Sequence, residues 1–170
     1  METGVLKARS AANMAGMKNL NLILSILGVL LTSTAHAEVQ LKLLDLPPDF
    51  SIEVYAEGVE NARQMALGDQ GTLFVGSRKA GKLWAVTDAD GNNRAETVRL
   101  IDKGLNMPSG LEFRDGALYV GAVDKILRYD GIEARLDQPP EPVVVTDVLP
   151  DKKHHGWKYL RFGPDGKLYI

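Results

Sequence analysis

Short apolar segments alternate with polar segments along this chain of 170 residues, and three of them are near copies of one another. The copies cover residues 71–75 (GTLFV), 116–120 (GALYV) and 166–170 (GKLYI), and they begin 45 and then 50 residues apart. In each copy a tight-turn glycine precedes apolar side chains at alternate positions, which is typical of a strand that leaves a β-hairpin. A repeat of this period indicates stacked units, and we predict a β-propeller of four-stranded blades.

The same alternation predicts further strands, and no helical periodicity of useful length follows residue 37, so the predicted class is all-β. Residues 38–170 hold about three units of the size of a blade, whereas closed propellers have four to eight. We therefore expect residues 38–170 to be the N-terminal part of a propeller domain, truncated relative to the complete ring. The expected strands besides the copies cover residues 50–55, 61–67, 82–86, 97–101, 109–113, 126–129, 143–145 and 157–162.

The first 37 residues have the pattern of an export signal. A basic start at Met17 and Lys18 precedes an apolar run over residues 20–31, and residues 35–37 (AHA) form an A-x-A cleavage motif. The apolar run is shorter than the roughly 20 residues that a membrane span needs. We predict that residues 1–37 are an N-terminal extension and signal peptide. The protein is then periplasmic or secreted, without stable membrane insertion after cleavage.

The amino-acid composition excludes some kinds of functional site and some classes of partner. The chain has no cysteine, which excludes a disulfide framework and any thiolate nucleophile or metal ligand. The formal net charge is −2, and no basic stripe stands out that could neutralise phosphates. We therefore expect small-molecule ligands and no nucleic-acid partner.

The third repeat is longer than the other two, and its extra length falls at residues 151–155 (DKKHH). His154 and His155 are the two histidines that follow the predicted signal peptide. Imidazole is the usual general base near neutral pH. The pattern by itself leaves three interpretations open: a catalytic base, an exposed pair without a special role, or metal ligands.

A second polar constellation lies between two predicted outer strands. Its oxygen-bearing side chains stand at positions 1, 3, 5 and 9 of a loop, a spacing that resembles calcium loops. The sixth position carries Asn93 where calcium loops have glycine, and asparagine also tolerates the left-handed conformation. The alternative is an ordinary hairpin turn, and any calcium here would be peripheral and structural. The four candidate ligands are Asp88, Asp90, Asn92 and Glu96.

Three loops that enter innermost strands should meet at one mouth of the propeller channel, at residues 61–64, 106–109 and 153–156. Their polar side chains either point into a cleft there or are solvated. Arg78 and Lys79 either hold a carboxylate-bearing ligand or belong to a solvated turn. For Trp157 and Tyr159 we expect packing between blades rather than stacking on a cofactor.

Several phrases resemble the glucose/sorbosone dehydrogenase family: residues 47–55 (PPDFSIEVY), 71–82, and 154–159 (HHGWKY) followed by 162–166 (FGPDG). The resemblance covers essentially all of residues 38–170. It implies an exported six-bladed propeller that binds pyrroloquinoline quinone (PQQ) with calcium and oxidises a sugar hydroxyl or an aldehyde hydrate. An unidentified electron acceptor is also implied.

The same resemblance implies roles for particular residues. His155 falls where the family has its proton-abstracting histidine, and Arg63, Gln64, Asn106 and His154 would edge the cofactor pocket. Related sugar dehydrogenases often have an arginine four residues after the histidine, where this chain has Tyr159, which favours the sorbosone-like branch. The family's main calcium ligands and quinone-holding cations lie in later blades, so we expect the 170 residues alone to be inactive.

Two other functions compete with this interpretation. A lactonase-type propeller hydrolase would hold a metal on the central axis with asparagines and a glutamate. Asn61 and Asn106 are available for it, but the entry loop of the first blade has no glutamate. A non-catalytic propeller that binds a ligand or partner on its rim is the other alternative.

Overall fold

The computed structural model describes residues 41–170, so the predicted signal peptide lies outside the described residues. Within residues 41–170, no helix is long and apolar enough to cross a membrane. The chain divides into two units, residues 1–45 and 46–170. The first contributes a short 3-10 helix, η1 (Leu41–Leu43), to the described part, and the second contains all the strands.

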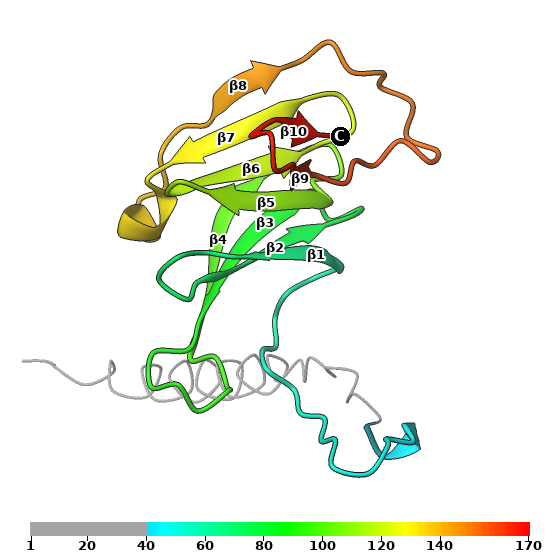
Figure 1. Ribbon diagram of the computed structural model, residues 1–170, viewed down its shortest axis with the longest axis vertical. Coiled ribbons are helices and arrows are strands. Elements are labelled where there is room, and N and C mark those ends of the chain that lie inside the picture. Colours follow the sequence, from blue (N-terminus) through cyan, green and yellow to red (C-terminus); the bar gives the residue numbers. More distant parts are fainter. Residues whose placement is uncertain (1–40) are drawn as a thin grey trace, which may run out of the picture. The chain divides into compact units, whose positions relative to one another are not determined.

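Two four-stranded antiparallel sheets form most of the second unit (Figure 1). In both sheets the spatial order of the strands follows the chain. The alternating apolar pattern therefore produced two successive meanders of the kind that make propeller blades. The first sheet contains β1 (Ala62–Leu67), β2 (Leu73–Ser77), β3 (Lys82–Thr87) and β4 (Thr97–Lys103), and the second β5 (Gly110–Arg114), β6 (Ala117–Gly121), β7 (Ile126–Asp130) and β8 (Val143–Thr146).

The third repeat begins after the second sheet, within the same unit of the chain. Its described strands are β9 (Arg161–Phe162) and β10 (Leu168–Tyr169), which pair antiparallel beside β5. A second 3-10 helix, η2 (Ile132–Arg135), lies between β7 and β8. The predicted all-β class is thus confirmed, and the sheets are blades of a β-propeller.

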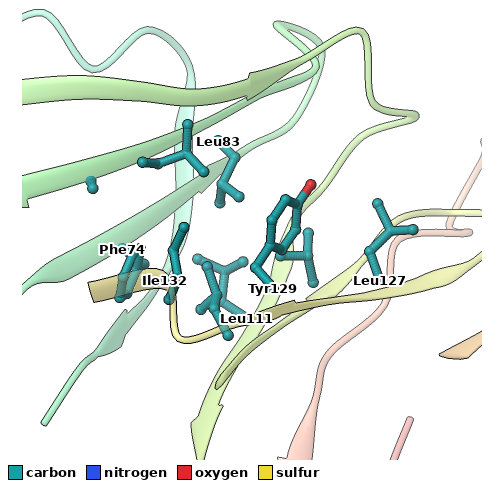
Figure 2. Packing of buried hydrophobic residues seen from close by; sticks show 10 residues of the cluster. Phe74, Leu83, Leu111, Leu127, Tyr129 and Ile132 are labelled. Atoms are coloured by element: carbon teal, nitrogen blue, oxygen red, sulfur yellow. The ribbon is translucent and has the colours of Figure 1, made fainter. Parts of the chain in front are cut away.

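The main core lies between the two four-stranded sheets (Figure 2). Alternate side chains of the central strands point into it, which is the consequence of the period-two pattern. One polar group is included: the Tyr129 hydroxyl donates a hydrogen bond to Asp102 Oδ2 at 2.6 Å. Burial and the neighbouring Asp102 raise the pKa of Tyr129 well above its ordinary value. The buried members of this core are Phe74, Leu83, Ala85, Ile101, Leu111, Leu118, Val120, Leu127, Tyr129 and Ile132.

The two sheets are also fastened at the end opposite the entry loops. Glu133 of η2 reaches the β1–β2 turn, where its carboxylate accepts the backbone N–H groups of Gln70 (3.1 Å) and Thr72 (3.3 Å). At the other end, Gly76 faces the Pro108 carbonyl so closely that a Cβ atom would collide with it. Sequence-distant turns therefore fix how one blade sits on the next.

Two expected strands differ from the structure. Residues 50–55 alternate but are not a strand, because no neighbouring strand pairs with them among residues 41–170. Within this stretch, the Tyr55 carbonyl is the one backbone acceptor, and it accepts a hydrogen bond from the Ala95 N–H group. The strand expected at residues 157–162 shortens to β9, since residues 157–160 leave the pairing and lie beside the second sheet instead.

Candidate functional site

A cavity lies at the end of the strands where the second and third entry loops meet the β2–β3 turn, and the first entry loop contributes no lining residue. Its volume is about 460 Å³. The β2–β3 turn, the segment before β5 and the loop before β9 each contribute to its walls, so no single blade forms it. The lining residues are Arg78, Lys79, Leu105, Asn106, Met107, Lys153, His154 and Trp157.

Each entry loop contains a non-glycine residue in the left-handed region. The φ angles are 57° for Asn61, 52° for Met107 and 56° for His155. This conformation is uncommon outside glycine, and for a residue such as methionine it needs support from its surroundings. Around Met107 that support comes from backbone bonds, Met107 N–H to Leu105 O at 3.0 Å and Ser109 N–H to Met107 O at 2.7 Å. A left-handed residue thus occurs in each of the three entry loops, although at a different position in each.

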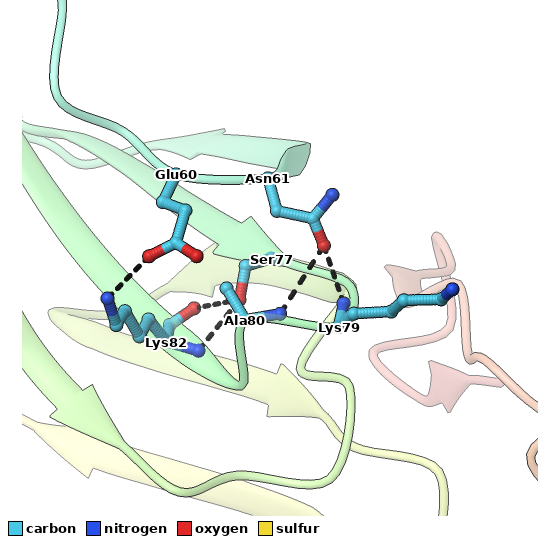
Figure 3. A network of polar contacts seen from close by, with 6 residues as sticks. All are labelled: Glu60, Asn61, Ser77, Lys79, Ala80 and Lys82. Carbon is cyan, nitrogen blue, oxygen red and sulfur yellow. Dashed lines mark hydrogen bonds and ion pairs between the residues drawn. The ribbon is translucent and has the colours of Figure 1, made fainter.

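Asn61 holds the β2–β3 turn in place (Figure 3). Its side-chain Oδ1 accepts the backbone N–H groups of Lys79 (2.6 Å) and Ala80 (3.3 Å), and its carbonyl accepts Arg78 N–H at 3.2 Å. The Asn61 oxygen is therefore committed to the turn, while Asn106 lines the cavity. This separation of the two asparagines weighs against the axial metal site that a lactonase needs.

Trp157 lies among cationic and imidazole groups at the cavity. The Arg78 guanidinium carbon is 4.6 Å from the Trp157 ring centroid, and that of Arg63 is 5.9 Å away. The His155 ring is tilted against the same indole at 5.5 Å. Cation–π contacts of this kind hold a guanidinium by its flat face. Residues 157–160 lie outside β9, so Trp157 and Tyr159 do not share a strand face as expected: the indole lines the cavity and contacts Arg78 of the first sheet, whereas Tyr159 is exposed.

The two histidines occupy different places. His154 lines the cavity, whereas His155 stands behind it with its ring 4.3 Å from the His154 ring and against Trp157. Both side chains are exposed. The left-handed backbone of His155 is what turns the two rings to face each other edge-on. The catalytic role assigned to His155 stays a prediction.

The charge around the cavity is one-sided. Among the described residues, no acidic side chain forms an ion pair with Arg63, Arg78, Lys79 or Lys153. On the sheets, by contrast, cations are paired, as in Lys82–Glu60 at 2.6 Å. Unpaired cations beside an aromatic face fit a flat, anionic ligand. PQQ is such a molecule, so the residues present fit the cofactor that the resemblance implies.

The other predicted cofactor contacts are spread more widely. Gln64 lies on β1, and its Oε1 is buried without a hydrogen-bond partner among the described residues. Arg63 does not line the cavity, but its guanidinium lies over the ring of Trp157, which does. The cavity instead includes Leu105, Met107 and Lys153, which no motif had indicated. Their signal in the sequence was only their place in equivalent loops of the repeat.

The predicted calcium loop connects β3 to β4, at the opposite end of β3 from the cavity. Carboxylate oxygens of Asp88, Asp90 and Glu96 lie within 4.8 Å of one another. Asn93 has a φ of 66°, as its place in the loop predicted. Asp88 accepts the backbone N–H groups of Gly91, Asn92 and Asn93 at 2.8–3.2 Å, and Asn92 Nδ2 donates to Asp90 Oδ2 at 2.9 Å. These bonds within the loop account for its shape as a hairpin connection.

Comparisons with known proteins bear on the fold. No protein-family profile matches the chain, and no curated protein sequence matches it. Among solved structures it is similar to the holo form of the PQQ domain of a pyranose dehydrogenase from Coprinopsis cinerea, with a TM-score of 0.56 and 14% sequence identity. The match covers 65% of this chain and 27% of that one. The chain therefore shares its fold with about a quarter of a PQQ domain.

Proposed function

We propose that this chain belongs to a PQQ-dependent oxidoreductase that acts on CH–OH or aldehyde groups of a sugar, of the sorbosone or aldose type. The observation that carries the proposal is the cavity where Trp157, His154 and the cations Arg78, Lys79 and Lys153 converge, with His155 against the Trp157 indole, in a propeller similar to a PQQ domain. In this proposal the chain supplies the first blades of a six-bladed ring, and later blades supply the main calcium ligands.

The residues of this chain have distinct parts in the proposed chemistry. Arg63, Gln64, Asn106 and His154 edge the cofactor, and His155 accepts the hydroxyl proton of the substrate on an imidazole nitrogen. A bound PQQ would supply the two-electron acceptor that takes up the hydride from the substrate carbon, and a bound calcium ion would polarise a quinone carbonyl. Leu105 and Met107 give the cavity an apolar wall.

The proposed setting follows from the same interpretation. Export by the predicted signal peptide places the protein in the periplasm or outside the cell, and electrons pass on to an unidentified acceptor. The cavity opens at the axial mouth between three loops, which gives a small substrate access without separating the blades.

The test is dye reduction by the protein as its gene encodes it, reconstituted with PQQ and calcium and supplied with aldoses and aldehydes. Substituting His155→Ala should lower turnover by about a hundredfold or more, because general-base catalysis contributes on that order. PQQ binding, measured by calorimetry, should change little. His154→Ala is the matched control and should retain most of the turnover.

Two results would contradict the proposal. The base assignment fails when His155→Ala leaves turnover intact or when His154→Ala loses as much. The oxidoreductase assignment fails when no sugar or aldehyde reduces the dye in the presence of PQQ and calcium.

A further inference from the structure

We infer that Arg78, Lys79 and Lys153 form a carboxylate-binding subsite in this cavity, with Trp157 as its platform, and that Asn61 positions Arg78 within it. The inference deepens the proposed function, on which it rests for the identity of the cavity as the ligand site. It names the chemistry that the ligand must have at this end of the cavity.

The repeat itself shows that an arginine is not required by the scaffold at this place. Arg78 stands two residues after Gly76, and Val123 stands two residues after the equivalent Gly121. Both backbone N–H groups donate to the carbonyl of an entry-loop asparagine, Arg78 to Asn61 and Val123 to Asn106 at 2.9 Å. In the second sheet the position is fully buried and apolar, whereas in the first sheet it is an exposed cation.

The guanidinium of Arg78 contacts Trp157 but has no acidic partner among the described residues. Its central carbon lies over the indole, 4.6 Å from the ring centroid, and no carboxylate among the described residues forms an ion pair with it. The fork of an arginine matches a carboxylate in a bidentate arrangement. Lys79 and Lys153 line the same cavity and add positive charge. The subsite therefore binds a carboxylate edge-on while an attached ring lies near the indole.

Asn61 sets where this guanidinium can reach. Its three bonds to the backbone of residues 78–80 fix the turn from which Arg78 and Lys79 project (Figure 3). In Figure 3 the Lys79 side chain extends away from the Glu60–Lys82 ion pair, so this turn separates a paired cation from an unpaired one. Asn61 thus acts through Arg78 and is a positioning residue.

Two sources can supply the carboxylate: the quinone cofactor, or a substrate that is a sugar acid. Calorimetric titration of the full chain separates them, with PQQ in one arm and glucuronate against uncharged glucose in the other. Arg78→Gln should weaken carboxylate binding at least about tenfold, since a charge-assisted hydrogen bond is worth that much. Arg78→Lys should recover part of the affinity because the charge remains.

Arg135→Gln is the matched control, because Arg135 is an exposed arginine in η2 at the opposite end of the strands. It should bind all ligands as the unsubstituted protein does, and thermal melting should show that both variants are equally folded. Weakened PQQ binding by Arg78→Gln assigns the subsite to the cofactor, and weakened glucuronate binding assigns it to the substrate. The subsite is overturned when neither carboxylate binds, or when Arg135→Gln weakens binding as much as Arg78→Gln.

The role of Asn61 has its own readout. Asn61→Gly keeps the left-handed backbone permissible but removes the side-chain acceptor, and it should weaken carboxylate binding about threefold. In the double variant with Arg78→Gln the two losses should not add, since Asn61 acts through Arg78. Additive losses would overturn the positioning role. If no dye is reduced but carboxylate binding still depends on Arg78, the redox function is refuted and the carboxylate-binding subsite is retained.

Discussion

The two four-stranded sheets have the same strand order, yet their faces are covered differently. The second sheet packs against the first sheet through the main core. Its other face packs against the third repeat, where the Tyr119 and Phe162 rings meet edge-on with their centroids 5.0 Å apart. Among the described residues, the outer face of the first sheet is covered by residues 55–59 and neighbouring loops, and Met65 and Leu67 of β1 are 63% and 66% exposed. A blade is thus defined by its own sequence pattern, whereas its stability depends on its neighbours.

The largest expected effect compares equivalent leucines of the two sheets. Leu118 is fully buried in the main core, whereas Leu73, at the same place in the repeat, is half-buried on the outer face. Leu118→Ala should lower the free energy of unfolding by about 3 kcal/mol because it leaves a cavity. Leu73→Ala should cost about 1 kcal/mol, in proportion to its smaller burial. Urea unfolding of both variants measures the difference, and equal losses would contradict the unequal covering of the sheets.

An intermediate effect concerns equivalent glycines at the ends of β2 and β6. A Cβ atom at Gly76 would collide with the Pro108 backbone carbonyl, whereas one at Gly121 would lie 3.0 Å from the Lys158 Cβ and 3.3 Å from Leu160 side-chain carbons, which need to move much less to admit it. Gly76→Ala should therefore cost about 2 kcal/mol and Gly121→Ala about 1 kcal/mol. Thermal unfolding of the two variants tests this ranking, and a larger loss from Gly121→Ala would reverse it.

The smallest effect concerns the hydroxyl that links the sheets. Tyr129→Phe should cost about 1 kcal/mol near neutral pH, because Asp102 loses a hydrogen-bond donor. The raised pKa of Tyr129 means that the folded chain keeps this proton above about pH 10, where the unfolded chain releases it. The stability from this group is therefore complete below about pH 10 and is lost at higher pH.

Unfolding of both proteins between about pH 8 and about pH 11 measures this linkage. The advantage of the unsubstituted protein over Tyr129→Phe should shrink as the pH rises. An advantage that grows with pH would show that the Tyr129 hydroxyl is not held as the structure describes.

Much of the candidate site was indicated by the repeat, but its assembly was not. Equivalent entry loops had to meet at one mouth, which brought Asn106 and His154 to the cavity as expected. Trp157 was expected in a packed strand, because an alternating pattern cannot show that residues 157–160 lack a pairing partner. The division of the two histidines, one lining the cavity and one against the indole, follows from the left-handed backbone of His155.

The sequence by itself determined the repeated hairpins and the all-β class, because side-chain alternation and hairpin glycines act over a few neighbouring residues. Only the tertiary structure decided which alternating segments became strands, since residues 50–55 have the pattern without a partner. It also decided that Arg78 lies on Trp157, because residues 79 positions apart meet only when one blade has packed on another. Local pattern makes the blades, and contacts between blades make the site.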